Sequence, residues 1–219
     1  MPVVDQATLQ DALAEAVASG RASAPLALLA ETQAALAPRA RAALGAAEAI
    51  ASARFEGEAA APVALSDAVL ARLDAIGQEQ PAKHTPSDAL AAELARLPAP
   101  LRDVALQAAA NGARWTFAAP GLRSLLISDE NGVRGEVLRI QPGHGAPTHT
   151  HEGCEYTLVL EGAFHDGHAH YGVGDISFAH PDLTHRPIAE PGPVCYAFAV
   201  TEAPLRFKGA LGVVQRLFS

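Results

Sequence analysis

The sequence predicts two domains of different class, an all-α helical bundle followed by a small antiparallel β-barrel. In a chain of 219 residues, 22 alanines fall in the first 60 residues and 11 in the 106 residues from Arg114, whereas 14 of the 18 glycines follow Asn111. Alanine is the best helix former and glycine supplies turns between strands. We therefore expect a helical domain over residues 1–80, a linker with one short helix over 81–112, and a β domain over 113–219.

Four helices are expected before residue 80, because apolar residues recur there at helical spacing. Asp5 can cap the first helix, Ser23 precedes the second, and Pro38 begins the third. The fourth has the clearest signals, with Ser66 as its N-cap and Gly77 as its stop. Their apolar faces are, in chain order, Leu9, Leu13, Ala16 and Val17; Leu26, Leu28, Leu29 and Leu36; Leu44, Ala47, Ala51 and Phe55; and Val69, Leu70, Leu73 and Ile76.

The segment between the two domains is polar and contains prolines. Residues 78–86 include two prolines and carry no apolar face. Ser87 can cap a short helix over Leu90, Leu94 and Leu97, and Pro98 and Pro100 are expected to end it.

From Arg114 the pattern changes to short apolar or alternating runs separated by turn residues, which indicates strands. Asp129 to Gly132 is predicted to form a hairpin turn, and glycines recur at close spacing afterwards, as in a small antiparallel barrel. The expected strands are Trp115 to Ala118, Leu122 to Ser128, Val133 to Ile140, Glu155 to Leu160 and Cys195 to Val200, with a further strand-turn-strand over Phe164 to His170.

Charge and composition exclude several classes of protein. Lysine and arginine total 16 against 24 acidic residues, a net charge of −8, which repels nucleic acid and anionic lipid alike. No apolar run approaches the ~20 residues of a membrane span. The two cysteines, Cys154 and Cys195, are too few for a disulfide framework. We expect a cytoplasmic protein that binds neither nucleic acid nor membrane.

Histidines cluster in the β domain, where eight of the nine lie between His144 and His185. His149 and His151 are two residues apart, so on a strand both rings point to the same face, and Glu155 follows one turn later. His185 is expected on a later strand. Three imidazoles and one carboxylate form a good donor set for a divalent transition metal, so these four residues are the predicted ligands.

The spacing around these residues resembles the first cupin motif throughout: Gly143, His149, His151, Glu155 and Gly162. The second motif is less complete. Gly174 and His185 keep the separation of that family, but His180 stands where proline is usual and Asp182 where glycine is usual. The resemblance implies a double-stranded β-helix barrel with the metal ligands His149, His151, Glu155 and His185.

Nearly the whole chain resembles the ChrR family of anti-sigma factors, in which a helical domain precedes a cupin domain. This resemblance implies that residues 1–80 bind and inhibit an alternative sigma factor of RNA polymerase, and that the cupin domain governs release in response to oxidative signals. It is carried by Pro147 to His151, Glu155, Val159 to Gly162, Phe164, Asp166, Tyr171, Gly174, Asp175, His185, Pro187, Cys195 and Ala203 to Phe207.

The helical half departs from the zinc-type anti-sigma domains, which carry His, three residues, Cys, two residues, Cys between helices two and three. Here Gln33, Ala37 and Ala40 stand at those positions, and none of them binds zinc as a thiolate or an imidazole does. We therefore predict no metal in the helical domain. Whether such a domain still binds a sigma factor is left open by the sequence.

Two functions use the same four ligands. The leading hypothesis is regulatory: residues 1–80 carry 5 basic and 10 acidic residues, and this excess of acid suits docking to a basic partner surface. The alternative is a cupin enzyme, a dioxygenase or isomerase, with the helical domain as a dimerisation arm. A zinc ion with four protein ligands would have a complete coordination sphere, which indicates a structural or regulatory site. Iron, manganese or nickel with six ligands would keep two coordination positions open for substrate.

Several residues of the β domain remain outside this scheme. Most of the surplus histidines are expected at the surface, with a second, weak metal site as the other interpretation. Cys154 is either a redox reporter beside the metal or an inert thiol, and Cys195 is expected in the core. The surplus histidines are His144, His165, His168, His170 and His180.

Overall fold

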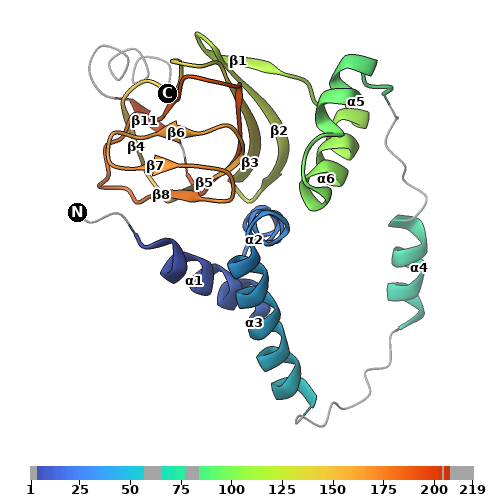
Figure 1. The fold of residues 1–219 in the computed structure, drawn as a ribbon. Helices are drawn as coiled ribbons and strands as arrows, with labels where there is room; N and C mark the ends of the chain where they lie inside the picture. The colour runs from blue at the N-terminus through green and yellow to red at the C-terminus, as the bar shows by residue number, and fades with distance from the viewer. Residues whose placement is uncertain (1–3, 57–65, 77–83, 204, 208–219) are drawn as a thin grey trace.

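The computed structural model describes residues 4–56, 66–76, 84–203 and 205–207, and it places two groups of helices around a β-barrel (Figure 1). α1, α2 and α3 lie below the barrel in this view, α5 and α6 lie beside β2, and α4 stands apart. Within these ranges no helix is long and apolar enough to cross a membrane. The helices are α1 Gln6–Ala18, α2 Ala24–Leu36, α3 Pro38–Glu56, α4 Asp67–Ile76, α5 Asp88–Leu94 and α6 Ala99–Ala110.

The helix starts follow the capping residues of the sequence. The Asp5 carboxylate accepts a hydrogen bond from the Thr8 backbone amide, and the Ser87 hydroxyl accepts one from the Leu90 amide. α2 and α3 begin at or beside Pro25 and Pro38. α4 also lies where the sequence predicts it, although Val69 and Leu70 of its apolar face are exposed. The predicted stop of α4, Gly77, and the side chains of residues 73–76 lie outside the described part.

Residues 84–112 hold two helices, not one, so the expectation that Pro98 and Pro100 only end a helix is wrong. They also begin the next one, because proline is well accommodated in the first turn of a helix, where the amide needs no partner within the helix. The resulting α6 packs against α2 and β2, and its Leu101 and Ala105 are fully buried. This part of the chain is therefore integrated into the core.

The strands form one large and two small antiparallel sheets. The six-stranded sheet has the order β1-β2-β3-β10-β5-β8, and the small sheets are β7-β6-β9 and β11-β4. β2 and β3 meet in the predicted hairpin, where Asn131 and Gly132 both have positive φ. The strands are β1 Thr116–Ala119, β2 Leu122–Glu130, β3 Val133–Ile140, β4 His149–His151, β5 Glu155–Glu161, β6 Phe164–His165, β7 His170–Tyr171, β8 Ile176–Ala179, β9 Ile188–Ala189, β10 Cys195–Thr201 and β11 Leu205–Phe207.

The central strands of the six-stranded sheet, β5 and β10, are buried on both faces. One face packs against the helices, and this core contains Leu29 of α2, Leu101 of α6, and Leu158 and Phe198 of the sheet. The opposite face contributes Val159 and Cys195 to a second core, inside the barrel. Alternation along a strand sends successive side chains to opposite faces, so each central strand serves the helical layer and the barrel interior at once.

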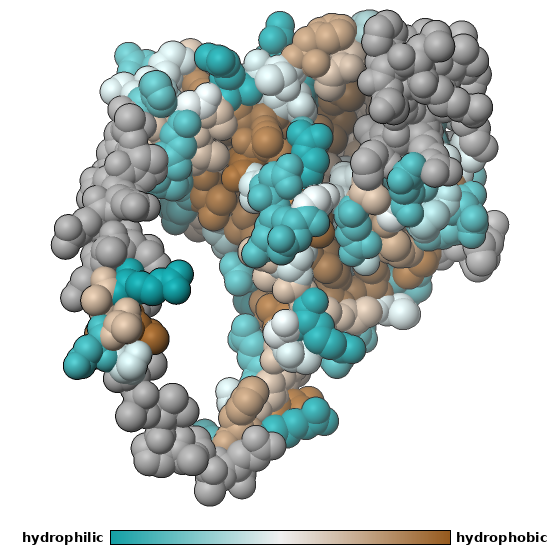
Figure 2. Space-filling view, turned by 180° about the vertical axis from the view of Figure 1, so that it is seen from behind, coloured by the Kyte–Doolittle hydropathy of each residue, from teal (hydrophilic) through white to brown (hydrophobic). Residues whose placement is uncertain are grey.

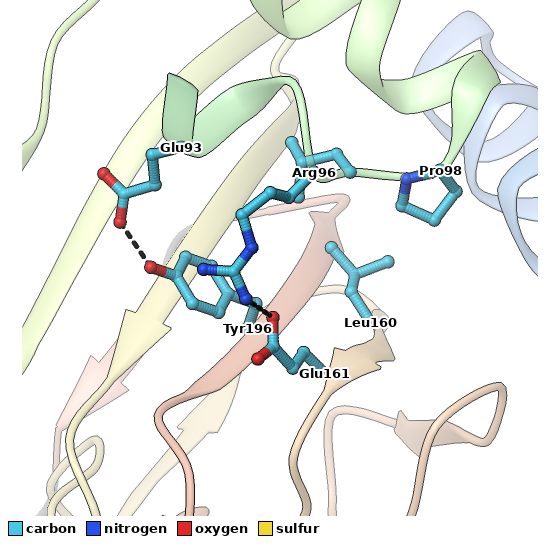
Figure 3. Close-up of a pocket in the computed structure, with 7 residues that line it drawn as sticks. Glu93, Arg96, Pro98, Leu160, Glu161 and Tyr196 are labelled. Atoms are coloured by element: carbon cyan, nitrogen blue, oxygen red, sulfur yellow. Dashed lines mark hydrogen bonds and ion pairs between the residues drawn. The ribbon is translucent and has the colours of Figure 1, made fainter. Parts of the chain in front are cut away.

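Hydrogen bonds and ion pairs connect α5 to the face of the sheet that packs against the helices (Figure 3). Glu93 pairs with Arg139 at 3.1 Å, and its carboxylate accepts hydrogen bonds from the Tyr196 hydroxyl and from the Trp115 indole nitrogen. Arg96, just beyond α5, pairs with Glu161 at 2.6 Å. These contacts lie beside buried apolar residues and fix where the segment turns from α5 into α6.

If α6 belongs to the core, Leu101→Ala will destabilise the chain by about 2–5 kcal/mol, because the change leaves a cavity at a fully buried site. Urea unfolding measures this. Val104→Ala on the same helix, where the side chain is 36% exposed, is the matched control and should cost well under half as much. Equal, small effects of the two changes would show that α6 does not pack as described.

Candidate metal centre

Three of the four predicted ligands are brought together by one short strand and one bridge. His149 and His151 are alternate residues of β4, and both are buried, while Thr150 between them points away and donates to the Pro181 carbonyl. His185 lies in an isolated bridge opposite His149, with two backbone hydrogen bonds of 3.1 Å. The sequence expectation that His185 belongs to a later strand is therefore wrong, although the bridge places its ring as such a strand would.

Glu155 completes the group from the first position of β5. Its Oε1 lies 3.7 Å from Nε2 of His151 and 3.8 Å from Nε2 of His185. The Nε2 atom of His185 lies 3.0 Å from Nε2 of both His149 and His151. One ligand atom from each residue thus falls within 4.8 Å of all the others. Four donor atoms that converge this closely can contact one ion together.

The three histidines are held neutral, the form that binds a metal. Burial first, and the nearby imidazoles second, lower the pKa of His151 to about 3 and that of His185 to about 4. Burial also lowers the pKa of His149. The Nδ1 atom of His149 lies 2.7 Å from the Pro147 carbonyl, to which it donates. That hydrogen bond leaves the lone pair on Nε2, directed at the cluster.

Glu155 supplies the negative charge of the group. Burial raises its pKa to about 7, and a hydrogen bond from the Thr157 hydroxyl acts in the opposite direction. A divalent cation beside the carboxylate would offset the cost of burying its charge. The donor chemistry, three neutral imidazole nitrogens and one carboxylate oxygen, therefore fits a transition metal, and these residues would hold it.

Asp166 is a buried carboxylate that organises the segment between β6 and β7, a role that the sequence did not reveal. Its buried carboxylate accepts from the backbone amides of His168 and Ala169, from the Tyr171 hydroxyl and from the Ser177 hydroxyl. Its carbonyl accepts from the amide of Arg186. The signal in the sequence was an ordinary Asp-Gly turn, which indicates local hydrogen bonds but not burial.

The surplus histidines and the cysteines lie outside the four-residue group. His144, His168 and His170 are exposed, and His165 and His180 are partly buried. Cys195 is fully buried, which confirms its predicted core position. Burial raises the pKa of the Cys195 thiol to about 12, and burial followed by Glu202 raises the pKa of the partly buried Cys154. Neither environment favours the reactive thiolate.

Gln33, Ala37 and Ala40, the three positions for which the sequence predicts no metal binding, lie at the end of α2 and the start of α3. Gln33 is 2% exposed and donates to the Gly174 carbonyl at 2.9 Å, and Ala40 is buried. Ala37 is the C-cap of α2. Among the residues that the structure describes, the group formed by His149, His151, Glu155 and His185 is the one whose donors converge.

Replacing Glu155 by Gln should weaken metal binding by about 10–100-fold, since the amide keeps the shape but removes the charge that the metal neutralises. Competition against a chelator measures this affinity. Glu161→Gln, at the other end of the same strand and outside the centre, is the matched control and should bind metal as the unmodified chain does.

Metal affinity should depend on pH through Glu155. Because its pKa is about 7, a proton competes with the metal below pH 7, and the dissociation constant should rise about tenfold for each unit below that value. Above pH 7 it should be flat, because His151 and His185, with pKa values of about 3 and 4, are already neutral. A steeper slope between pH 5 and 7 would mean that the histidines also lose protons on binding.

Comparison with known proteins agrees with this architecture. Residues 104–204 match the family described as the ChrR cupin-like domain. The chain is 37% identical over 216 residues to the anti-sigma-E factor ChrR of Cereibacter sphaeroides, covering 96% of both chains. It also matches the crystal structure of Rhodobacter sphaeroides SigE in complex with the anti-sigma ChrR, with a TM-score of 0.65, 33% sequence identity, and coverage of 92% of this chain and 98% of that chain.

The similarity extends through both the helical half and the barrel, so it covers the whole arrangement described above. With more than a third of residues identical over nearly the full length, the chain belongs to the ChrR family of anti-sigma factors.

Proposed function

We propose that the chain is an anti-sigma factor whose residues 1–80 bind an alternative sigma factor of RNA polymerase. A metal held by His149, His151, Glu155 and His185 in the cupin domain modulates that binding in response to oxidative signals. Because sigma factors act on RNA polymerase, the protein works in the cytoplasm. The observation that supports this proposal most strongly is the 37% identity to an anti-sigma factor along both domains.

A groove between α1 and α3 supplies a docking surface for the sigma factor. Its volume is about 620 Å³, and its floor is lined mainly by alanines of the two helices. Ile50 and Phe55 on its α3 side are 58% and 72% exposed. Asp11 and Glu15 stand at its α1 side. Asp11 and Glu15 are paired with Arg39 and Arg21, and Arg54 also lines the groove, so its rim carries both signs of charge, and its apolar floor suits the apolar face of an amphipathic helix.

α4 offers a second apolar surface. Val69 and Leu70 are 42% and 45% exposed on a helix that stands away from the rest of the molecule (Figure 2). Exposed apolar side chains on helices are typical of interaction sites. A partner that contacts both α4 and the groove would bury the apolar residues that the helical half leaves in solvent.

We propose zinc as the metal. Four protein ligands complete a tetrahedral zinc sphere, which suits a regulatory role and leaves no place for a substrate. The family relationship does not favour the cupin enzyme that the sequence kept as an alternative. The test is to purify the tagged chain from its native host and to identify its metal and its bound proteins. Iron, manganese or nickel in a protein without a bound sigma factor would contradict the regulatory function and support the enzyme.

The docking surface predicts the effect of a charge placed on it. Phe55→Asp combined with Ile50→Asp should weaken binding of the sigma factor at least tenfold, because it buries two carboxylates in an apolar contact. The sigma factor is recovered with the tagged chain from its native host and titrated by calorimetry. Phe117→Asp on β1, where the side chain is also 72% exposed, is the control and should leave the affinity unchanged. Equal affinities for all three proteins would place the sigma factor elsewhere.

A further inference from the structure

Two glutamine side chains attach the helical half to one strand of the barrel. On α1, the Gln6 amide donates to the Ile176 carbonyl at 2.7 Å and accepts from the Ile176 amide at 3.0 Å. On α2, the buried Gln33 amide donates to the Gly174 carbonyl at 2.9 Å. The contacts thus reach the first residue of β8, Ile176, and the turn that precedes the strand, at Gly174.

β8 needs such partners because it is an edge of the six-stranded sheet. Asp175 and Gly174 bond to Val159 of β5 on the inner side, through hydrogen bonds of 3.0 Å. The backbone groups of Ile176 are bonded instead to Gln6. A carboxamide carries a donor and an acceptor on one group, so it can occupy the place of a neighbouring strand at one residue.

The start of β8 also lies close to the end of α2. Gly174 has a φ of +90°, and a Cβ atom built on it would lie 3.5 Å from Cβ of Ala37. The turn and the helix are therefore in van der Waals contact, which limits how far either can move alone.

From β8 the contacts continue to the metal centre by two routes. β8 pairs with β5, where Ala179 lies opposite the ligand Glu155. The Ser177 hydroxyl donates to Asp166, whose carbonyl accepts from the residue after His185. Two of the four ligands are thus joined to the strand that Gln6 and Gln33 hold.

We propose that Gln6 and Gln33 form a latch that couples metal loading of the cupin centre to the order of α1 and α2. A bound metal would fix the position of Glu155 at the start of β5. Because β5 pairs with β8, both strands would become more ordered, and the hydrogen bonds of Gln6 and Gln33 would extend this order to the two helices. α1 also lines the docking groove, so loss of the metal would loosen one wall of that groove. The inference rests on the part of the proposed function in which the cupin centre binds a metal, and it does not depend on binding of a sigma factor.

Hydrogen exchange of the full chain tests the latch, with the chain stripped by a chelator and then loaded with Zn²⁺ alone. In the unmodified chain, loading should slow amide exchange several-fold in β4 and β5 and also in α1 and α2. In the Gln6→Leu, Gln33→Leu double variant, loading should slow exchange in β4 and β5 only. Gln10→Leu is the matched control, because Gln10 is a buried glutamine of α1 that contacts Arg39.

The outcomes separate the two proposals. If Zn²⁺ binds and slows exchange in β4 and β5 but leaves the helices unchanged in the unmodified chain, the latch is wrong and the metal centre stands. If Zn²⁺ does not bind, the metal centre and the latch are both wrong. Equal helix protection in the double variant and in Gln10→Leu also overturns the latch. Gln6→Leu alone, at a half-buried position, replaces the double variant if that protein does not fold.

Discussion

The structure depends on a β-sheet whose central strands are buried on both faces. In β5, Leu158 faces the helices, whereas Val159 faces the barrel interior. The pleat makes this division unavoidable, since neighbouring side chains of a strand point in opposite directions. The strand that packs against the helical layer thus also carries Glu155 of the metal centre at its first position, whereas the three histidines come from β4 and an isolated bridge outside this sheet.

The chemistry of the centre follows from this burial. Inside the barrel, water no longer stabilises charge, so the imidazoles of His151 and His185 stay neutral and the Glu155 carboxyl retains a proton more readily. A divalent ion would favour the charged form of Glu155, and the neutral imidazoles of His151 and His185 would offer it nitrogen lone pairs that carry no proton at neutral pH. Burial thus prepares the donors before any ion arrives.

Polar side chains join the helices of the N-terminal half to one another and to the barrel. Gln33 bonds to Gly174 of the barrel. A salt bridge of 3.0 Å between Asp11 and Arg39 joins α1 to α3 at the surface, where such a pair contributes little to the free energy of folding. The buried leucines of α1 and α2 contribute more, and they are shared with the sheet and α6. Packing against the sheet and α6 therefore stabilises the helices more than the surface ion pair does.

The sequence by itself predicted the helices α1 to α5, the longer strands β2, β3, β5 and β10, the cap residues Asp5 and Ser87, and the hairpin of β2 and β3. These features depend on spacing between neighbours in the chain, which periodicity and turn chemistry express directly. It did not determine α6, because proline both ends and begins helices, and only packing against β2 shows which applies. The burial of Asp166, the bridge at His185 and the attachment of Gln6 and Gln33 to β8 were decided by the tertiary structure alone. Each joins residues distant in sequence, and no local pattern records which backbone groups of an edge strand lack a partner.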